Sequence, residues 1–245
     1  MATLRTGLQA GGDDPELRYQ LGRSLADAGR FEEAREQYIA VPVSTDGHFA
    51  SIDVSIMGFR RYHNLAAVCL QLDRYKEAKE WWLKAMHEAP AFTPAAFDLF
   101  NEAPTREDLK CARTCLDHVH AVEGPRSNWI EMGQKYAEAT GGPENVEPFL
   151  VRAIQQHPWS LDLRLALTKR LLSEERAREA LPILMDLQAR GVAEAAFYLG
   201  VLDIRAGRYE AALRWMERAD SLAPGHQGTL DQIGGLRRLL GEDGG

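Results

Sequence analysis

The stretch Ala193–Pro224, AEAAFYLGVLDIRAGRYEAALRWMERADSLAP, decides the fold of this chain of 245 residues. Small residues at Gly200, Ala212 and Ala219 allow two helices to approach closely, and the bulky residues between them fill the contact. Gly207 is predicted to end the first helix, because that position needs the left-handed conformation that glycine adopts without strain. The proline at the end of the stretch stops the second helix. The stretch therefore predicts a helix–turn–helix unit.

The same pattern returns earlier in the chain. The segment 15–41 carries Leu21, Gly22, Gly29, Phe31, Ala34 and Tyr38 at matching offsets. In the segment 59–92 the interval from Ala78 to Pro90 equals the interval from Ala212 to Pro224. This agreement in register indicates that the chain repeats one structural unit.

The repeated unit resembles the tetratricopeptide repeat (TPR), a helix–turn–helix of about 34 residues. The resemblance implies an all-α TPR solenoid, a right-handed superhelix of about six helix–turn–helix pairs plus a C-terminal capping helix. The expected segments are a flexible leader (1–14), TPR 1 (15–41), an insertion (42–58), TPR 2 (59–92), a degenerate TPR 3 (93–125), TPR 4 (126–159), TPR 5 (160–191), TPR 6 (192–226) and the capping helix with its tail (227–245).

Several helix ends are predicted from local signals. Asp14 and Pro15 suit the N-cap and first turn of the first repeat. Thr105-x-x-Asp108 suggests a capping box that opens a helix. The pair Glu174-Glu175 is expected at a helix start, where carboxylates complement the macrodipole. Arg237 and its neighbour favour the C-terminal end of the closing helix.

Composition limits the classes of function. A net charge of −7 argues against nucleic acid as the main partner, since phosphate binding needs a basic stripe. The N-terminal residues lack the apolar core of a signal peptide, and no apolar run reaches the length of a membrane span. Three cysteines do not suggest a disulfide scaffold. We expect a cytoplasmic protein with no membrane partner.

Catalytic constellations are weak. Cys111, Cys115 and His118 share one helical face and would offer three soft ligands to zinc, but the C-x-x-C spacing is absent and cysteine is commonly buried. No H-E-x-x-H, G-x-S-x-G, phosphate loop or dinucleotide fingerprint occurs. We therefore expect no catalytic residue, no metal and no cofactor, and predict that the chain is not an enzyme.

The partner-binding candidates lie on the first helix of each pair, which is expected to line the concave face. By register they are Tyr19, Arg23, Arg60, His63, Gln71, Phe97, Ile130, Gln134, Lys169, Phe197 and Arg205. The aromatic members could instead pack on adjacent helices, and the charged ones could simply be solvated. The cations do not form the lysine–asparagine–arginine cluster of chaperone-binding TPR domains. An extended peptide or partner helix in the groove is the expected ligand.

A second resemblance concerns the segment 46–78. It is similar to a segment of bacterial family 2 glycosyltransferases that carry TPR repeats behind their catalytic domain. The matching residues are Asp46, Gly47, His48, Arg61, His63, Asn64, Leu65 and Ala66, with Tyr62 where arginine is commoner. The Asp-x-Asp metal site of the catalytic domain is missing from this chain. Two hypotheses follow: a non-catalytic interaction scaffold, or the TPR accessory region of such an enzyme, supporting a catalytic domain that this chain lacks.

Overall fold

The computed structural model describes residues 2–11, 14–42 and 53–241. These residues form fourteen α-helices and three short 3₁₀ helices, with no strand among them, which confirms the expected all-α solenoid. The chain divides into two compact units, the N-terminal unit (residues 1–124) and the C-terminal unit (residues 125–245). Within the described ranges, no helix is both long enough and apolar enough to cross a bilayer.

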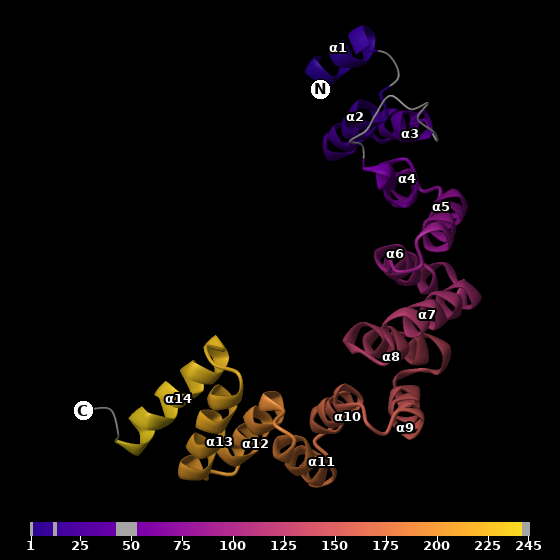
Figure 1. The fold of residues 1–245 in the computed structure, drawn as a ribbon. Helices are drawn as coiled ribbons and strands as arrows, with labels where there is room; N and C mark the ends of the chain where they lie inside the picture. Colours follow the sequence, from indigo (N-terminus) through magenta and orange to yellow (C-terminus); the bar gives the residue numbers. More distant parts are fainter. Residues whose placement is uncertain (1, 12–13, 43–52, 242–245) are drawn as a thin grey trace. The chain divides into compact units, whose positions relative to one another are not determined.

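The N-terminal unit is a stack of helix pairs (Figure 1). Its helices are α1 (Ala2–Gly11), α2 (Pro15–Asp27), α3 (Phe31–Ile39), η1 (Val54–Ile56), α4 (Phe59–Gln71), α5 (Tyr75–Glu88), α6 (Pro94–Glu102), η2 (Pro104–Arg106) and α7 (Leu109–Glu123). α2 packs against α3, α4 against α5, and α6 against α7. α3 also packs on α4 and α5 on α6, so each pair contacts the next pair along the chain.

The C-terminal unit repeats this arrangement and ends with a single helix (Figure 1). Its helices are α8 (Ser127–Gly141), η3 (Pro143–Asn145), α9 (Val146–Gln156), α10 (Leu161–Ser173), α11 (Ala177–Ala189), α12 (Ala193–Arg205), α13 (Tyr209–Leu222) and α14 (Gln227–Leu240). The pairs are α8 with α9, α10 with α11, and α12 with α13, and α14 packs on α13.

The close approach of α12 and α13 depends on small residues, as the sequence predicted. A Cβ atom added to Gly200 would lie 2.8 Å from Met216 Cε and 3.3 Å from the Ala212 backbone oxygen. Ala212 has no exposed surface, and Ala219 is 3% exposed. A larger side chain at these positions would push the two helices apart.

The closing helix α14 covers the last repeat, which confirms its predicted role as a cap. Its Ile233 and Leu236 pack with Leu213 and Met216 of α13 in one apolar cluster. The two arginines in its last turn face the negative end of the helix dipole. The cap therefore removes from water the apolar face that a terminal repeat would leave open.

The turns inside four pairs share one backbone form. In each, a residue with positive φ is followed by an arginine. The backbone N–H of that arginine donates to the backbone carbonyl five residues back, always at 2.9 Å. The positive-φ residues are Gly29 (73°), Asp73 (57°), Glu175 (61°) and Gly207 (71°). The arginines are Arg30, Arg74, Arg176 and Arg208. The predicted left-handed role of Gly207 is confirmed, and the same role falls to a carboxylate residue in two other turns.

Two helix-end predictions need correction. The capping box from Thr105 does not form: the Thr105 hydroxyl donates to the Glu102 carbonyl, and Asp108 itself caps α7 by accepting the Cys111 N–H at 3.2 Å. Pro104 keeps the chain in a 3₁₀ turn, so the helix starts three residues later than the box implied. Glu174 does not open a helix either, since it follows the last residue of α10. The predicted cap at Asp14 is confirmed, with Leu17 N at 2.9 Å.

The expected leader contains a helix. The glycines at its end favour a flexible leader over residues 1–14, whereas α1 extends from Ala2 to Gly11. Leu4 and Leu8 lie one turn apart and are half-buried. A Cβ on Gly7 would lie 3.1 Å from Leu17 Cδ1, so the glycine lets α1 approach α2. Packing on α2 therefore outweighs the low helix propensity of the glycines.

The insertion is described only at its ends. Residues 43–52, including Asp46, Gly47 and His48 of the glycosyltransferase-like segment, lie outside the described residues. On the described side, Arg61 is 5% exposed and donates from Nη1 to the Val41 carbonyl at 2.6 Å. This bond links the start of α4 to the end of the first pair across the insertion.

Candidate partner-binding grooves

A groove of about 480 Å³ opens on the C-terminal unit between α8, α10 and α12, with most of its lining from α8 and α10. We call it the C-terminal groove. These are the first helices of three successive pairs, which are the helices expected to carry the binding surface. The lining residues are Ser127, Ile130, Glu131, Gln134, Asp162, Leu165, Ala166, Lys169, Arg170, Ser173 and Glu194.

One stripe of α10 forms the middle of the C-terminal groove. Its lining residues recur every three or four positions and therefore share a helical face: Asp162, Leu165, Ala166, Lys169, Arg170 and Ser173. Ser160 fixes where α10 begins, because its hydroxyl oxygen accepts the Leu163 N–H at 3.3 Å. The cap therefore fixes the start of the helix that carries the stripe.

The C-terminal groove combines an apolar floor with charged edges. Ile130 is 3% exposed, and Leu165 is half-buried beside it. Lys169 pairs with Glu194 of α12 at 2.7 Å, so its charge is already balanced by a carboxylate of the chain. Asp162 is exposed and forms no ion pair with any described residue. A ligand would meet apolar surface in the middle and an available carboxylate at one edge.

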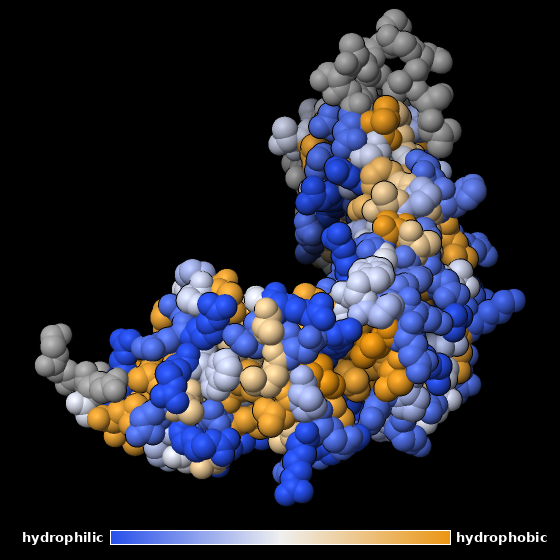
Figure 2. Space-filling model, turned by 60° about the horizontal axis from the view of Figure 1, so that its bottom comes forward, coloured by the Kyte–Doolittle hydropathy of each residue, from blue (hydrophilic) through white to orange (hydrophobic). Residues whose placement is uncertain are grey.

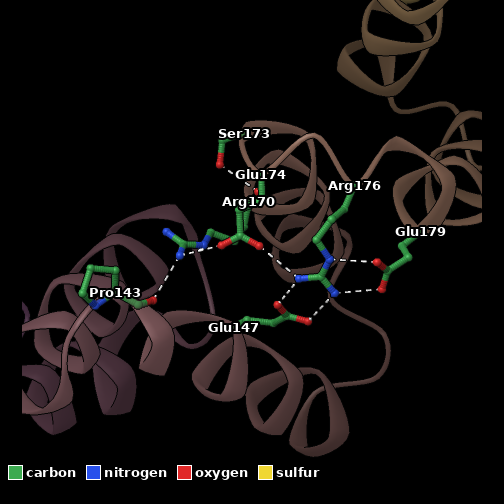
Figure 3. Close-up of polar contacts among 7 residues, drawn as sticks. All are labelled: Pro143, Glu147, Arg170, Ser173, Glu174, Arg176 and Glu179. Carbon is green, nitrogen blue, oxygen red and sulfur yellow. Dashed lines mark hydrogen bonds and ion pairs between the residues drawn. The ribbon is translucent and has the colours of Figure 1, made fainter.

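A network of charged side chains includes Arg170 of the groove lining and joins it to neighbouring helices (Figure 3). Arg170 donates to the Pro143 carbonyl at 3.1 Å and pairs with Glu174 at 2.6 Å. Arg176 contacts Glu174 at 3.0 Å and two further carboxylates, Glu147 of α9 and Glu179 of α11. The hydrogen bonds that Arg176 donates to these carboxylates, the bond to Glu179 foremost, raise the pKa of Arg176 above its ordinary value. The network ties α9, α10 and α11 together.

A second groove of about 330 Å³ opens on the N-terminal unit, chiefly between α2 and α4. We call it the N-terminal groove. Its lining residues are Arg23, Ala26, Asp27, Phe31, Tyr38, Asn64, Ala67, Val68 and Gln71. Arg23 is exposed and has no hydrogen bond or ion pair with a described residue. Its guanidinium and the exposed Gln71 amide are free donors for a ligand.

Two buried tyrosines lie at the N-terminal groove: Tyr38 is part of its lining, and Tyr19 lies behind it. The Tyr19 hydroxyl accepts a hydrogen bond from Asn64 Nδ2 at 2.9 Å, and the Tyr19 ring packs against Tyr38 with centroids 5.7 Å apart. Burial raises the pKa of both tyrosines above the ordinary value, so both hydroxyls keep their protons. The hydroxyls therefore serve as neutral hydrogen-bonding groups.

His63 and Asp98 meet on α4 and α6, outside the lining of either groove. His63 Nε2 lies 3.6 Å from Asp98 Oδ2, and the His63 ring stands edge-on to Phe92. Burial lowers the pKa of His63, although the charge of Asp98 opposes that change. Burial likewise raises the pKa of Asp98, against the charge of His63. Burial thus favours the uncharged form of the His63 ring.

The structure brings five of the eleven predicted site residues into the two grooves and leaves the other six elsewhere. The C-terminal groove is lined by Ile130, Gln134 and Lys169, and the N-terminal groove by Arg23 and Gln71. The other six lie as follows: Tyr19 is buried behind the N-terminal groove, Arg60 pairs with Asp53, His63 faces Asp98, Phe97 is half-buried on α6, Phe197 lines a separate pocket of about 370 Å³ with Tyr198 and His226, and Arg205 is exposed in the last turn of α12.

Sequence reasoning missed several lining residues. Asn64 and Asp162 line the grooves, yet neither was among the candidates. The signal was present: Asp162 lies seven residues before Lys169, which is two helical turns on the same face. Asn64 follows His63 directly, so only the exact rotation of α4 decides which of the two meets the groove. That rotation comes from packing, which a single sequence does not specify.

A further apolar groove of about 330 Å³ lies between α11, α12 and α13. Leu181 and Met185 line it and are each 46% exposed, and Trp215 is half-buried beside them. Figure 2 shows apolar side chains on the surface of the C-terminal unit among polar ones. The two arginines at its edge are Arg178 and Arg208, and Arg208 pairs with Asp203 at 2.5 Å.

The possible zinc ligands on α7 separate in the structure. Cys111 and Cys115 are buried, whereas His118 Nε2 lies 2.9 Å from the Pro90 carbonyl oxygen. No group of three or more histidine, cysteine or carboxylate side chains suited to a metal occurs within the described residues. His118 instead links α7 to the end of the preceding pair.

Comparison with known proteins identifies the repeats. The segments 15–38 and 193–218 match one family model described as tetratricopeptide repeat, and the segment 59–91 matches a second model with the same description. These segments coincide with the pairs α2–α3, α12–α13 and α4–α5. The chain therefore contains TPR repeats and folds as an all-α TPR solenoid. TPR solenoids present extended surfaces that bind other proteins.

Several solved structures are similar to this chain. A tetratricopeptide repeat protein from Parabacteroides merdae is 14% identical, with 96% of this chain and 90% of that chain covered and a TM-score of 0.49. The C-terminal part of a TPR protein from Cytophaga hutchinsonii is 8% identical, with 95% and 92% covered and a TM-score of 0.48. MamA is 13% identical, with 63% and 85% covered and a TM-score of 0.48. No curated protein matches the chain in sequence.

Proposed function

We propose that this chain is a non-catalytic interaction scaffold that holds an extended peptide or a helix of a partner protein in its C-terminal and N-terminal grooves. The observation that carries the proposal is which helices form the two grooves. Their lining comes mainly from the first helices of successive TPR pairs, and both grooves hold groups available to a ligand.

The two grooves would contribute different contacts. In the C-terminal groove, the apolar floor at Ile130 and Leu165 suits an aliphatic or aromatic side chain, and Asp162 suits a cation of the peptide. In the N-terminal groove, Arg23 and Gln71 would donate to peptide carbonyl groups or to a carboxylate. A ligand of mixed apolar and polar character fits both surfaces.

A displayed library of random linear peptides tests the proposal without a known partner. Peptides selected on the intact chain are synthesised, and their dissociation constants are measured by calorimetry. We expect Ala166→Arg, which places a long side chain in the C-terminal groove, to abolish binding of the peptides that occupy it. Gln134→Ala and Lys169→Ala should weaken the same peptides.

The matched control is Arg152→Ala on α9, an exposed side chain that lines neither groove. It should leave the affinity of every selected peptide unchanged. Circular dichroism confirms that each variant keeps its helices. If Ala166→Arg and Arg152→Ala bind all peptides as well as the parent chain does, the C-terminal groove is not the binding surface.

The second candidate is an accessory region of a bacterial family 2 glycosyltransferase. Its support is the resemblance of the segment 46–78, in which Arg61, His63 and Asn64 belong to α4. In this case the partner would be a glycosyltransferase catalytic domain, and the insertion 42–58 would contact that domain or its acceptor.

An immunoblot of the source cells separates the two candidates. A band near 27.4 kDa favours a scaffold that acts alone, whereas a much larger band favours a repeat region attached to a catalytic domain. Replacing residues 43–52 by a short glycine–serine linker then tests the insertion. Unchanged docking to a co-encoded transferase would exclude its proposed contact.

A further inference from the structure

The apolar groove between α11, α12 and α13 shares no lining residue with the C-terminal or the N-terminal groove, so the proposed binding function does not use it. We call it the second-helix groove, because α11 and α13 are the second helices of their pairs. The deeper lining comes from α12, where Leu199 is 3% exposed and Leu202 is half-buried.

An apolar stripe of α11 forms one side of the second-helix groove. Ala177, Leu181 and Met185 recur every four residues and therefore share one helical face. Leu181 and Met185 are both large and both nearly half exposed, and Trp215 of α13 adds a half-buried aromatic ring to the lining. Large apolar side chains that gather on a surface mark interaction sites, whereas single ones do not.

Ion pairs join neighbouring second helices in the N-terminal unit. An alanine without exposed surface marks one repeat position on α3, α5, α11 and α13, namely Ala34, Ala78, Ala180 and Ala212. Arg35 follows the first of these alanines and pairs at 2.5 Å with Glu77, which precedes the second. Lys79 follows the second alanine and pairs with Asp108 at the start of α7. A cation at this position therefore ties one second helix to the next.

The same positions are apolar at the second-helix groove. Leu181 follows Ala180 and so takes the place that Arg35 has on α3. Ala211 precedes Ala212 and takes the place of Glu77. Leucine and alanine cannot form the ion pair that joins α3 to α5. The second-helix groove is therefore a departure from the repeat pattern, in which apolar surface replaces a bridge between helices.

The exposed charge at the edge of the second-helix groove is positive. Arg178 is exposed and forms no hydrogen bond or ion pair with a described residue. The Arg208 side chain is 62% exposed, although it pairs with Asp203. Asp203 carries the one carboxylate among the described lining residues and is only 9% exposed. A ligand would thus meet guanidinium groups, which favours a partner with acidic side chains.

We propose that the second-helix groove docks an amphipathic helix of a partner protein, with apolar side chains on one face and carboxylates beside them. The apolar face packs on Leu181, Met185 and Trp215, and a carboxylate pairs with Arg178. The stripe on α11 is about 12 Å long, which matches roughly two turns of a docked helix.

The composition of the lining favours a helix over an extended peptide. Apart from Arg178, Asp203 and Arg208, the lining side chains are apolar and offer no hydrogen-bonding groups to a peptide backbone. A helix satisfies its own backbone groups and needs only side-chain contacts, whereas an extended chain would leave amides and carbonyls unpaired.

A displayed library of amphipathic helical peptides, with the apolar and the flanking positions varied, tests the proposal on the intact chain. Selected peptides are synthesised with a fluorescent label, and their dissociation constants are measured by anisotropy. We expect peptides with apolar side chains three and four residues apart and with aspartate or glutamate beside them. Leu181→Lys and Met185→Lys should each weaken their binding at least about tenfold, because each places a charge against the apolar face.

Charge reversal tests the acidic character of the partner. Arg178→Glu should weaken the selected peptides about fivefold. It should bind the same peptides better once lysine replaces their carboxylates. The matched controls are Leu239→Lys on α14 and Arg152→Glu on α9, two exposed side chains outside the groove, and both should leave the affinities unchanged.

Ala166→Arg, which blocks the C-terminal groove, should also leave these affinities unchanged, so the two binding proposals stand or fall separately. Circular dichroism verifies that each variant keeps its helices. A selection without any peptide that depends on Leu181 would overturn the proposal, as would dependent peptides with lysine or arginine beside the apolar face. Self-association of the chain that Leu181→Lys abolishes would instead assign the groove to a second copy.

Discussion

Gly200 of α12 and Met216 of α13 occupy one contact, in which a Cβ on the glycine would lie 2.8 Å from the methionine Cε. Gly234 of α14 is also helical but has open space around it. The two glycines therefore separate the effect of packing from the effect of helix propensity.

We expect Gly234→Ala to stabilise the chain by up to about 1 kcal/mol, because alanine is the better helix former. Gly200→Ala should be destabilising, because overpacking costs roughly 1–3 kcal/mol and outweighs the same gain in propensity. Urea unfolding followed by circular dichroism measures both. Equal stabilisation by the two substitutions would contradict the close contact at Gly200.

Glu175 has a φ of 61° in the turn between α10 and α11, a conformation that suits glycine. We expect Glu175→Gly to stabilise the chain by about 1 kcal/mol through relief of backbone strain. The control is Glu174→Gly in the same turn, where φ is −95° and the carboxylate pairs with Arg170. That substitution should be destabilising, and thermal unfolding distinguishes the two.

Ile233 and Leu236 bury the end of the last repeat, at 8% and 3% exposure. Leu236→Ala should destabilise the C-terminal unit by about 2–5 kcal/mol, because it leaves a cavity against α13. Leu239→Ala is the control, since that side chain is 69% exposed. Hydrogen exchange should show faster opening of α13 only in the first variant. Equal exchange in the two variants would mean that α14 does not protect the repeat.

The ion pair between Lys79 and Asp108 predicts a response to acid. Its hydrogen bond to Lys79 lowers the pKa of Asp108 below its ordinary value of 3.8. The pair therefore stabilises the folded chain above that ordinary value, and the stabilisation is lost as the pH falls through the lower pKa of the folded state. Asp108→Asn should be less stable than the parent chain at neutral pH and equally stable in strong acid.

Urea midpoints at the two pH values measure this difference. Asparagine still caps α7, so the variant removes mainly the charge. Asp117→Asn is the control, because Asp117 and its partner Arg113 are each 59% exposed and such pairs contribute little. An acid response unchanged in Asp108→Asn would contradict the assignment.

Much of the fold could be predicted from the sequence because its signals are local. Gly207, Asp14 and the spacing of Ala78 and Ala212 each fix a turn, a cap or a crossing within a few residues. The left-handed carboxylate at Glu175 could not be predicted in this way, because no side-chain preference marks it. There the packing of α10 against α11 imposes the left-handed backbone conformation.

The sequence could predict which helices line the grooves, but not which of their residues do so. Register identified α10 and its Lys169, but the first helices rotate to suit their packing. Tyr19 turned inward onto Tyr38, and Asn64 reached the N-terminal groove in place of His63. A rotation of one residue on a helix is about 100°. That angle decides which side chain meets a ligand and is set by contacts distant in sequence.

The turns at Arg30, Arg74, Arg176 and Arg208 keep one backbone hydrogen bond. In the first three the arginine also pairs with the glutamate three residues on, whereas Arg208 pairs with Asp203 of the preceding helix. The backbone of the turn thus persists where that ion pair is replaced by another. One turn backbone can therefore connect different helix pairs. Recombination could duplicate or reorder such pairs, and only the surface charges would then need further substitutions.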